Sequence, residues 1–145
     1  MIRKGTREDL PYIVEMAGHF INQTNYNQVL RFMPRAIAEL AEQVLDVGIV
    51  FIAEDQGKRV GMICGLPFIE PIGHRKTLDE LVWWVEPAYR GSSSVGPRLL
   101  RQFENWARQK QLDLCKMIAP VGTNVGDYYT KRGYVPVETI YLKRL

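Results

Sequence analysis

Residues 78–110 combine a strand, a polar loop and an amphipathic helix, and this stretch constrains the fold more than any other part of the chain. Residues 81–85 read LVWWV, a run of strand-forming side chains. After a turn at Glu86-Pro87 and a Gly/Ser-rich loop over residues 90–94, one apolar helical face follows, formed by Val95, Leu99, Leu100, Phe103 and Trp106. A loop at a helix N-terminus offers free backbone N–H groups and the positive end of the helix dipole, so the stretch predicts a site for an anion such as pyrophosphate.

Two well-known phosphate-binding motifs do not fit this loop. A P-loop requires a lysine followed by serine or threonine after its second glycine, whereas Gly96 is followed by Pro97 and Arg98. A dinucleotide-binding fold requires the pattern GxGxxG and an acidic residue at the end of a second strand, and the stretch has neither. The predicted anion site therefore belongs to another kind of strand-loop-helix unit.

The approach to the loop resembles that of a known family. Residues 85–91, VEPAYRG, are similar to the V-x-P-x-x-R-G segment that precedes the coenzyme A loop in the GCN5-related N-acetyltransferase (GNAT) superfamily. The loop departs from the family pattern Q/R-x-x-G-x-G/A, because Ser93 stands where the middle glycine is expected and the span to Gly96 is one residue longer. The resemblance implies that the pantetheine arm of coenzyme A pairs with backbone groups of Trp84 and Val85. It also implies that the pyrophosphate lies over the loop residues Arg90, Gly91, Ser92, Ser93, Ser94, Val95 and Gly96.

The rest of the chain predicts elements in the order that this resemblance implies. A short strand at residues 1–4 precedes a helix that begins at Thr6 or Asp9, and a second helix runs from Pro34 to Gly48. Residues 48–54 and 59–66 are apolar runs joined by a turn, which is typical of a β-hairpin. We expect further elements as follows: a connecting loop at 68–76, a strand at 112–119, a last helix after residue 124, and two short strands near 134–137 and 139–143.

The resemblance implies a single N-acetyltransferase-like domain over residues 1–145. Its fold class is α/β (α+β), with a mixed, mostly antiparallel central sheet flanked by helices. The expected order is strand, two helices, three strands, helix, strand, helix and two strands. A chain of 145 residues has the length of one domain and can bury a substantial core.

Glu80 is the predicted general base for transfer of an acetyl group to an amine. It precedes the LVWWV strand as a glutamate precedes the equivalent strand in histone acetyltransferases of the family, so the resemblance implies this role. Large apolar side chains beside the carboxylate would disfavour its charged form and raise its pKa, the direction that a base acting on an ammonium group requires. The alternative is a solvated carboxylate at the start of the strand.

Residues 124–134, NVGDYYTKRGY, resemble the closing segment of the family's domain, in which a tyrosine is followed four residues later by Gly-Phe. Here Tyr129 precedes Gly133, and Tyr134 replaces the phenylalanine. The resemblance implies that Tyr129 donates a proton to the leaving coenzyme A thiolate, because a tyrosine with an ordinary pKa of about 10 is protonated at neutral pH. The alternative is that Tyr129 only packs the last helix. Asn124 either binds the pantetheine arm or caps that helix.

The implied co-substrate is acetyl-CoA, and the implied acceptor is a primary amine of a small molecule or a peptide. In this family the segment between the first two helices borders the acceptor site, so Tyr26, within the amide-rich residues 22–32, is a candidate substrate contact. A solvated loop is the alternative. The charge pattern of residues 22–27 and 68–76 selects no class of amine, so the acceptor stays open.

Composition argues against several other classes of function. A net charge of +3 is compatible with an anionic ligand but is too small and dispersed for a nucleic-acid-binding protein. No apolar run approaches the ~20 residues of a membrane span, and the first ten residues lack the apolar core of a signal peptide, so a cytoplasmic location is expected by default. Cys64 and Cys115 lie in separate apolar runs without metal-binding spacing, which favours buried free thiols and no metal site.

Two alternatives to an acetyltransferase stay open. The altered loop is compatible with a non-catalytic module on the same fold, either an acyl-CoA-binding sensor or a protein-interaction domain. The other alternative is an enzyme with a larger acyl donor, since the facing of Trp83 and Trp84 would decide the size of the acyl pocket. Dimers are common in the family, so a homodimer is also an expectation, although the sequence identifies no interface.

Overall fold

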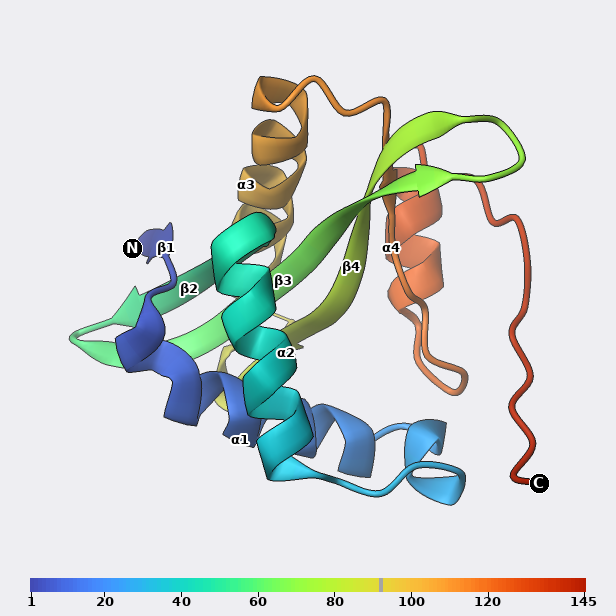
Figure 1. Cartoon of the computed structure of the whole chain (residues 1–145). Coiled ribbons are helices and arrows are strands. Elements are labelled where there is room, and N and C mark those ends of the chain that lie inside the picture. Colours follow the sequence, from blue (N-terminus) through green and yellow to red (C-terminus); the bar gives the residue numbers. More distant parts are fainter. Residues whose placement is uncertain (92) are drawn as a thin grey trace.

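The computed structural model describes residues 1–91 and 93–145, and it orders their elements as the sequence predicts up to the last helix (Figure 1). The strands are β1 (Ile2–Lys4), β2 (Ile49–Asp55), β3 (Lys58–Glu70), β4 (Arg75–Val85) and β5 (Leu114–Lys116). The helices are α1 (Leu10–Asn22), α2 (Pro34–Val47), α3 (Val95–Gln109) and α4 (Val125–Lys131), with 3-10 turns η1 (Arg7–Asp9), η2 (Asn25–Gln28) and η3 (Pro87–Tyr89).

The described strands form one sheet in the order β1-β2-β3-β4-β5. Neighbouring strands are antiparallel except β4 and β5, which run parallel. The β2–β3 hairpin turns at Gln56 and Gly57, whose φ angles of 47° and 76° suit a two-residue turn between twisted strands. The predicted fold class, a mixed and mostly antiparallel sheet flanked by helices, is confirmed.

Each face of the sheet buries its own set of side chains, because successive residues of a strand point to opposite faces. On β2, Val50 and Ile52 pack in a cluster with residues of α1 and α2, which lie in front of the sheet in Figure 1. Phe51 and Ala53 pack in a second cluster, with residues of α3 and with Tyr129 of α4. The helices thus cover both faces of the sheet in two separate layers.

An irregularity in the pairing of β3 and β4 lies near the centre of the sheet. Gly65 pairs with Glu80 and Cys64 pairs with Val82, so β4 carries one extra residue, Leu81. Glycine is required opposite this bulge, because a Cβ at position 65 would lie 2.5 Å from the carbonyl oxygen of Asp79. The pairing of β4 with β5 ends at Asp79, so the rest of β4 has no strand beside it on that edge among the described residues.

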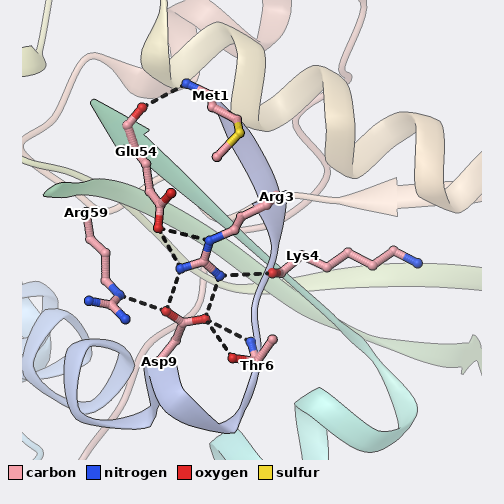
Figure 2. A network of polar contacts seen from close by, with 7 residues as sticks. All are labelled: Met1, Arg3, Lys4, Thr6, Asp9, Glu54 and Arg59. Atoms are coloured by element: carbon pink, nitrogen blue, oxygen red, sulfur yellow. Dashed lines mark hydrogen bonds and ion pairs between the residues drawn. The ribbon is translucent and has the colours of Figure 1, made fainter. Parts of the chain in front are cut away.

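A buried carboxylate connects the start of the chain to the central strands (Figure 2). Asp9 is fully buried and accepts hydrogen bonds from Arg3 Nη1 at 2.8 Å and Arg3 Nη2 at 2.9 Å. It also accepts one from Arg59 Nε at 2.7 Å and one from the backbone N–H of Thr6 at 2.8 Å. Arg3 in turn donates to Glu54 Oε1 at 2.7 Å. The network therefore ties β1, β2 and β3 to the beginning of α1.

The connecting loop predicted at residues 68–76 is wrong. β3 and β4 continue as a long hairpin, and their pairing extends to Glu70 and Arg75. Prolines at positions 67 and 71 suggested a loop, but Pro71 lies in the hairpin turn itself. Pro67 is tolerated within β3 because the pairing with β2 ends at Gly65, so position 67 has no partner on that side that needs its N–H.

The predictions for the last third of the chain are wrong in two respects. The strand predicted at residues 112–119 is reduced to β5, and residues 134–145, all of them described, contain neither a helix nor a strand. A segment forms a strand only where a neighbouring strand completes its backbone hydrogen bonds. Among the described residues, no segment pairs with the outer edge of β5, so residues 134–145 have no neighbouring strand. The two short strands predicted near 134–137 and 139–143 are therefore absent.

Two smaller findings concern the cysteines and the helices. Cys64 and Cys115 are free thiols, and Cys64 is buried as predicted, whereas Cys115 is half-buried. Of the helices in the described part of the chain, none combines the length and the apolar character that crossing a bilayer requires.

Candidate active site

Glu80 is a buried carboxyl group at the point where β4 loses its neighbour β5. The residue is only 4% exposed, and its Oε2 accepts a hydrogen bond from the backbone N–H of Ile118 at 2.8 Å. The extra residue Leu81 follows directly, so the bulge in β4 sets the direction in which the Glu80 side chain leaves the strand. The alternative of a solvated carboxylate is wrong, because the side chain lies inside the protein.

Burial raises the pKa of Glu80 to about 8, because the charged form loses its hydration in the protein interior. The hydrogen bond from the Ile118 N–H acts in the opposite direction, since it stabilises the carboxylate. The raised pKa agrees in direction with the expectation from the sequence. A carboxyl group with this pKa exchanges its proton near neutral pH, which suits a general base.

Tyr129 reaches the same backbone position from α4. Its hydroxyl donates a hydrogen bond to the carbonyl oxygen of Ile118 at 3.0 Å. The residue is buried, and its ring stacks on Trp83 with 6.0 Å between the ring centroids. Burial, with the charge of Glu80 nearby, raises the pKa of Tyr129 well above its ordinary value, so the hydroxyl is a protonated donor at neutral pH.

The structure thus brings together two residues that the family resemblance singled out in separate segments of the sequence. Glu80 and Tyr129 come from β4 and α4, and they bind the N–H and the carbonyl of one residue, Ile118. Ile118 was not among the predicted site residues, because its contribution is made by backbone atoms and leaves no side-chain signature in the sequence.

The loop before α3 is fixed by contacts within itself. Gly91 has a φ of 80°, a conformation that glycine adopts without strain. The hydroxyl of Ser93 donates to the carbonyl of Tyr89 and accepts a hydrogen bond from the Val95 N–H at 3.4 Å. Ser93, which replaces the expected glycine, therefore stabilises the turn into α3 through these two hydrogen bonds. Ser92, also predicted to contact the coenzyme, lies outside the described residues.

The first turn of α3 packs closely on β4. Ser94 precedes the helix, and its carbonyl accepts the N–H of Arg98 at 3.0 Å. Gly96 is buried, and a Cβ added to it would lie 3.3 Å from the ring of Trp83. The indole N–H of Trp83 is buried and has no hydrogen-bond partner among the described residues. Trp83 therefore packs between the start of α3 and Tyr129, and its indole N–H is available as a hydrogen-bond donor.

Trp84 lies between a cation and an imidazole ring. The guanidinium of Arg90 is 4.5 Å from the centroid of its ring, and the ring of His19 stacks at 5.7 Å with an interplanar angle of 21°. No spacing in the sequence connects His19 with Trp84, which lies 65 positions later in the chain. Arg90 is thus held against β4 beside the loop that it begins.

The backbone groups of Trp84 and Val85 face opposite ways. The carbonyl of Trp84 points to β3, because a Cβ added to Gly61 would lie 3.0 Å from it. The N–H of Glu86 donates to Val60 of β3, so by alternation the Val85 N–H points away from β3. The Val85 carbonyl accepts a hydrogen bond from Arg90 Nε at 2.7 Å. Of the two predicted backbone contacts, Val85 is the one that faces the edge of β4 without a neighbour.

The other two predicted residues take no part in the side-chain hydrogen bonds to Ile118. Asn124 is exposed and occupies the N-cap position of α4, as one of its two predicted roles requires, although its side chain makes no capping hydrogen bond. Tyr26 lies in η2, and its ring is 5.9 Å from that of Phe20 on α1. Phe20 packs with the α1/α2 cluster and Tyr129 packs with the α3 cluster. Tyr26 and Tyr129 are therefore on different faces of the sheet.

A hollow of about 240 Å³ lies beside the loop before α3. Its lining includes Ser93, Ser94, Val95 and Arg98, together with Tyr89 of η3. A larger hollow of about 390 Å³ lies near the other end of α3, where Trp106 and Lys110 contribute to its wall. Only the smaller hollow adjoins residues that the sequence associates with an anion.

Comparison with known families gives one match. The family model described as "Acetyltransferase (GNAT) domain" matches residues 46–136, which is more than half of the chain and includes Glu80, the loop and Tyr129. Among proteins with curated descriptions, none resembles the chain closely enough in sequence to count as a match.

Solved structures with the same fold cover nearly the whole chain. A predicted acetyltransferase from Clostridium acetobutylicum, solved with acetyl-CoA, has a TM-score of 0.80 at 15% identity and covers 99% of this chain and 95% of its own. An aminoglycoside 6'-N-acetyltransferase from Acinetobacter haemolyticus has a TM-score of 0.74 at 17% identity, with 100% and 98% covered. A ribosomal-protein-alanine N-acetyltransferase from Brucella melitensis biovar Abortus 2308 has a TM-score of 0.70 at 17% identity, with 100% and 99% covered. At such low identities these structures establish the fold alone.

Proposed function

The chain belongs to the GNAT acetyltransferase family, and from this premise we propose that it transfers an acetyl group from acetyl-CoA to a primary amine of a small molecule or a protein. The amine attacks the thioester directly while both substrates are bound. The proposal rests on one observation: Glu80 and Tyr129 both form hydrogen bonds with the backbone of Ile118. This contact lies at the edge of β4, beyond its pairing with β5. A proton acceptor and a proton donor are thereby held next to an edge where an extended ligand can lie.

The residues at this edge fit acetyl-CoA as a substrate. The N–H of Val85 points away from β3, so it is directed to the side where the pantetheine arm would lie. The buried N–H of Trp83 has no hydrogen-bond partner among the described residues and is a second donor for that arm. Arg90 and the start of α3 supply positive charge and dipole for the phosphates, and the loop residues Gly91, Ser93, Ser94, Val95 and Gly96 border the same region.

Glu80 and Tyr129 divide the proton transfers between them. The amine nitrogen bonds to the acetyl carbon and gives a proton to the Glu80 carboxylate, while the carbon–sulfur bond breaks. The proton of the Tyr129 hydroxyl then goes to the leaving thiolate, for which it turns away from the Ile118 carbonyl. Solvent afterwards restores both groups to their initial protonation states.

Acetyl-CoA is expected to bind the intact chain with a dissociation constant at or below roughly the millimolar range of enzyme substrates. The reason is that the loop, Arg90 and the edge of β4 present cationic and backbone N–H groups in one region. Isothermal titration calorimetry measures this directly, and pantetheine, which lacks the phosphates and the nucleotide of coenzyme A, is the control for their contribution. Absence of detectable binding would remove the proposed function.

The Tyr129→Phe variant is expected to lower kcat by about 100-fold and to leave the affinity for acetyl-CoA within a few-fold of the parent. Phenylalanine keeps the stacking on Trp83 and removes only the hydroxyl that donates to Ile118. Steady-state kinetics with coenzyme A release as the readout measures the effect. The neighbouring variant Tyr128→Phe is the control, and equal turnover in the Tyr129 variant and the parent would exclude Tyr129 as the acid.

One observation favours a second candidate, a non-catalytic acyl-CoA-binding or protein-interaction module. Both Glu80 and Tyr129 are buried and already engaged with Ile118, as residues with a purely structural role would be. Coenzyme A release, assayed across a panel of polyamines, aminoglycosides and peptides, separates the two functions. Tight acetyl-CoA binding without turnover supports the sensor, and no binding supports the interaction module. The same panel identifies the acceptor amine, and with longer acyl-CoA thioesters it tests the preferred acyl group.

A further inference from the structure

Arg90 occupies part of the edge of β4 that an extended ligand would need. Its Nε donates a hydrogen bond to the carbonyl oxygen of Val85 at 2.7 Å. In an antiparallel strand the N–H and the carbonyl of one residue point to the same side, and those of Val85 point away from β3. Beyond Asp79 this side of β4 has no neighbouring strand among the described residues. The guanidinium of Arg90 therefore lies across an edge that is otherwise free to pair.

Trp84 holds the guanidinium in this position. Atom Cζ of Arg90 is 4.5 Å from the centroid of the Trp84 ring, which is within the range of a cation–π attraction. The ring has little freedom to move, because Trp84 is only 5% exposed and packs in the cluster formed with α1 and α2. The ring of His19 stacks on it from α1 at 5.7 Å. Two contacts with β4, one to a carbonyl and one to a fixed ring, thus hold Arg90 at the edge.

The same guanidinium is free to move toward an anion. Arg90 is exposed, and its hydrogen bond to Val85 also lies at the surface. Its side chain makes no other hydrogen bond within the described part of the chain, so four of its five N–H groups remain as donors. A phosphate accepts bidentate, charge-assisted hydrogen bonds from a guanidinium, and these are stronger than a bond to a neutral carbonyl. A phosphate bound at the loop before α3 would therefore draw Arg90 away from the edge of β4.

We propose that Arg90 determines which thioesters the protein accepts, because it closes the edge of β4 to donors that carry no phosphate. This inference rests on the proposed function, since it assumes that the pantetheine arm pairs with Val85. When the phosphates of acetyl-CoA bind the guanidinium, Arg90 leaves the Val85 carbonyl, and an amide N–H of the pantetheine arm takes its place. A thioester with the same arm but no phosphate must displace Arg90 without this compensation, so it binds more weakly.

The Arg90→Ala variant is expected to change the affinities for two ligands in opposite directions. Pantetheine, which has the arm but no phosphate, should bind the variant about 5- to 10-fold more tightly than it binds the parent, because no hydrogen bond or cation–π contact has to be broken. Acetyl-CoA should bind the variant at least about 10-fold more weakly, because its phosphates lose the guanidinium. Isothermal titration calorimetry with the intact chain measures both affinities. A residue that only bound phosphate would leave the affinity for pantetheine unchanged.

The Arg98→Ala variant is the matched control. Arg98 lies in the first turn of α3 and lines the hollow beside the loop, so this change removes one positive charge from the same region. It should leave the affinity for pantetheine as in the parent, and circular dichroism checks that both variants keep the parental fold. If Arg90→Ala binds pantetheine no more tightly than the parent does, Arg90 does not close the edge. If the parent binds no acetyl-CoA, the proposed function fails, and this inference fails with it.

The two halves of coenzyme A give an independent measurement. 3′-Phospho-ADP carries the phosphates, and pantetheine carries the arm. In the parent, saturating 3′-phospho-ADP is expected to raise the affinity for pantetheine by about 5- to 10-fold, because the phosphates have already drawn Arg90 from the edge. Arg90→Ala should show no such coupling. Independent binding of the two halves by the parent, or equal coupling in the variant, would contradict the proposal.

Discussion

Replacing Glu80 with glutamine is expected to lower kcat by about 10²- to 10⁴-fold, the usual range for loss of a general base. Glutamine has the shape of the protonated side chain and keeps an oxygen that accepts the Ile118 N–H, so the site should retain its geometry. The affinity for acetyl-CoA should change little. The pH dependence provides the specific signature: the kcat of the parent rises as Glu80 loses its proton around pH 8, and the variant loses this rise.

Stability should change in the opposite sense to activity. Burial raises the pKa of Glu80 from 4.5 to about 8, so between these values the folded protein holds a proton that the unfolded chain has released. The parent therefore loses free energy of unfolding as the pH rises from 4.5 to 8, at up to about 1.4 kcal/mol per pH unit. Glu80→Gln removes this slope, so above pH 6 it should unfold at higher urea concentration than the parent.

The Glu42→Gln variant is the matched control for both measurements, because Glu42 is exposed on α2. It should leave the pH dependence of stability and of kcat as in the parent. If Glu80→Gln retains the parental kcat and pH profile, Glu80 is not the base. A retained slope of stability with pH would show that another group binds the proton.

Replacing Asp9 with alanine is expected to lower the free energy of unfolding by about 3–5 kcal/mol, as removal of one partner from a buried ion pair does. Asp9 is fully buried and receives hydrogen bonds from Arg3 and Arg59, so alanine leaves both guanidinium groups without their carboxylate (Figure 2). For a chain of this length the melting temperature should fall by roughly 10 °C or more. Thermal and urea unfolding followed by circular dichroism measure the loss.

The chain offers a matched control for Asp9 on its surface. Arg7 and Asp46 form an exposed ion pair at 2.9 Å, and Asp46→Ala should cost less than about 1 kcal/mol. The hydrogen bonds to Arg3 lower the pKa of Asp9 well below its ordinary value of 3.8. The stabilisation is therefore complete above about pH 4 and is lost progressively as the pH falls below it. An Asp9 variant as stable as the Asp46 variant would show that the network does not stabilise the fold.

Local patterns in the sequence predicted most of the fold. Helix α2 begins at Pro34 and ends before Gly48 as expected, and the β2–β3 hairpin forms at the predicted turn. The predictions failed where the structure depends on a neighbour from elsewhere in the chain. Pro67 is tolerated in β3 only because β2 has ended beside it, and the apolar residues after Tyr134 form no strand because no neighbouring edge reaches them.

The side chains of the candidate site could be proposed from the sequence, but the contacts between them could not. Glu80 and Tyr129 follow from a family resemblance, and the apolar run beside Glu80 correctly predicts the direction of its pKa. The stacking of His19 on Trp84 joins α1 to β4, and no spacing within either segment indicates it. The packing of Gly96 against Trp83 likewise depends on how α3 crosses the sheet, which is a property of the folded chain.

The hydrogen bonds to Ile118 also determine how the site tolerates change in evolution. Because Glu80 and Tyr129 both bind backbone atoms, the side chain at position 118 plays no part in holding them. Relatives can therefore carry different residues at this position and keep the same two hydrogen bonds. Proline is the exception, since it has no N–H to donate to the carboxylate. A search for invariant side chains would pass over this position, although an amide hydrogen there is indispensable to the arrangement.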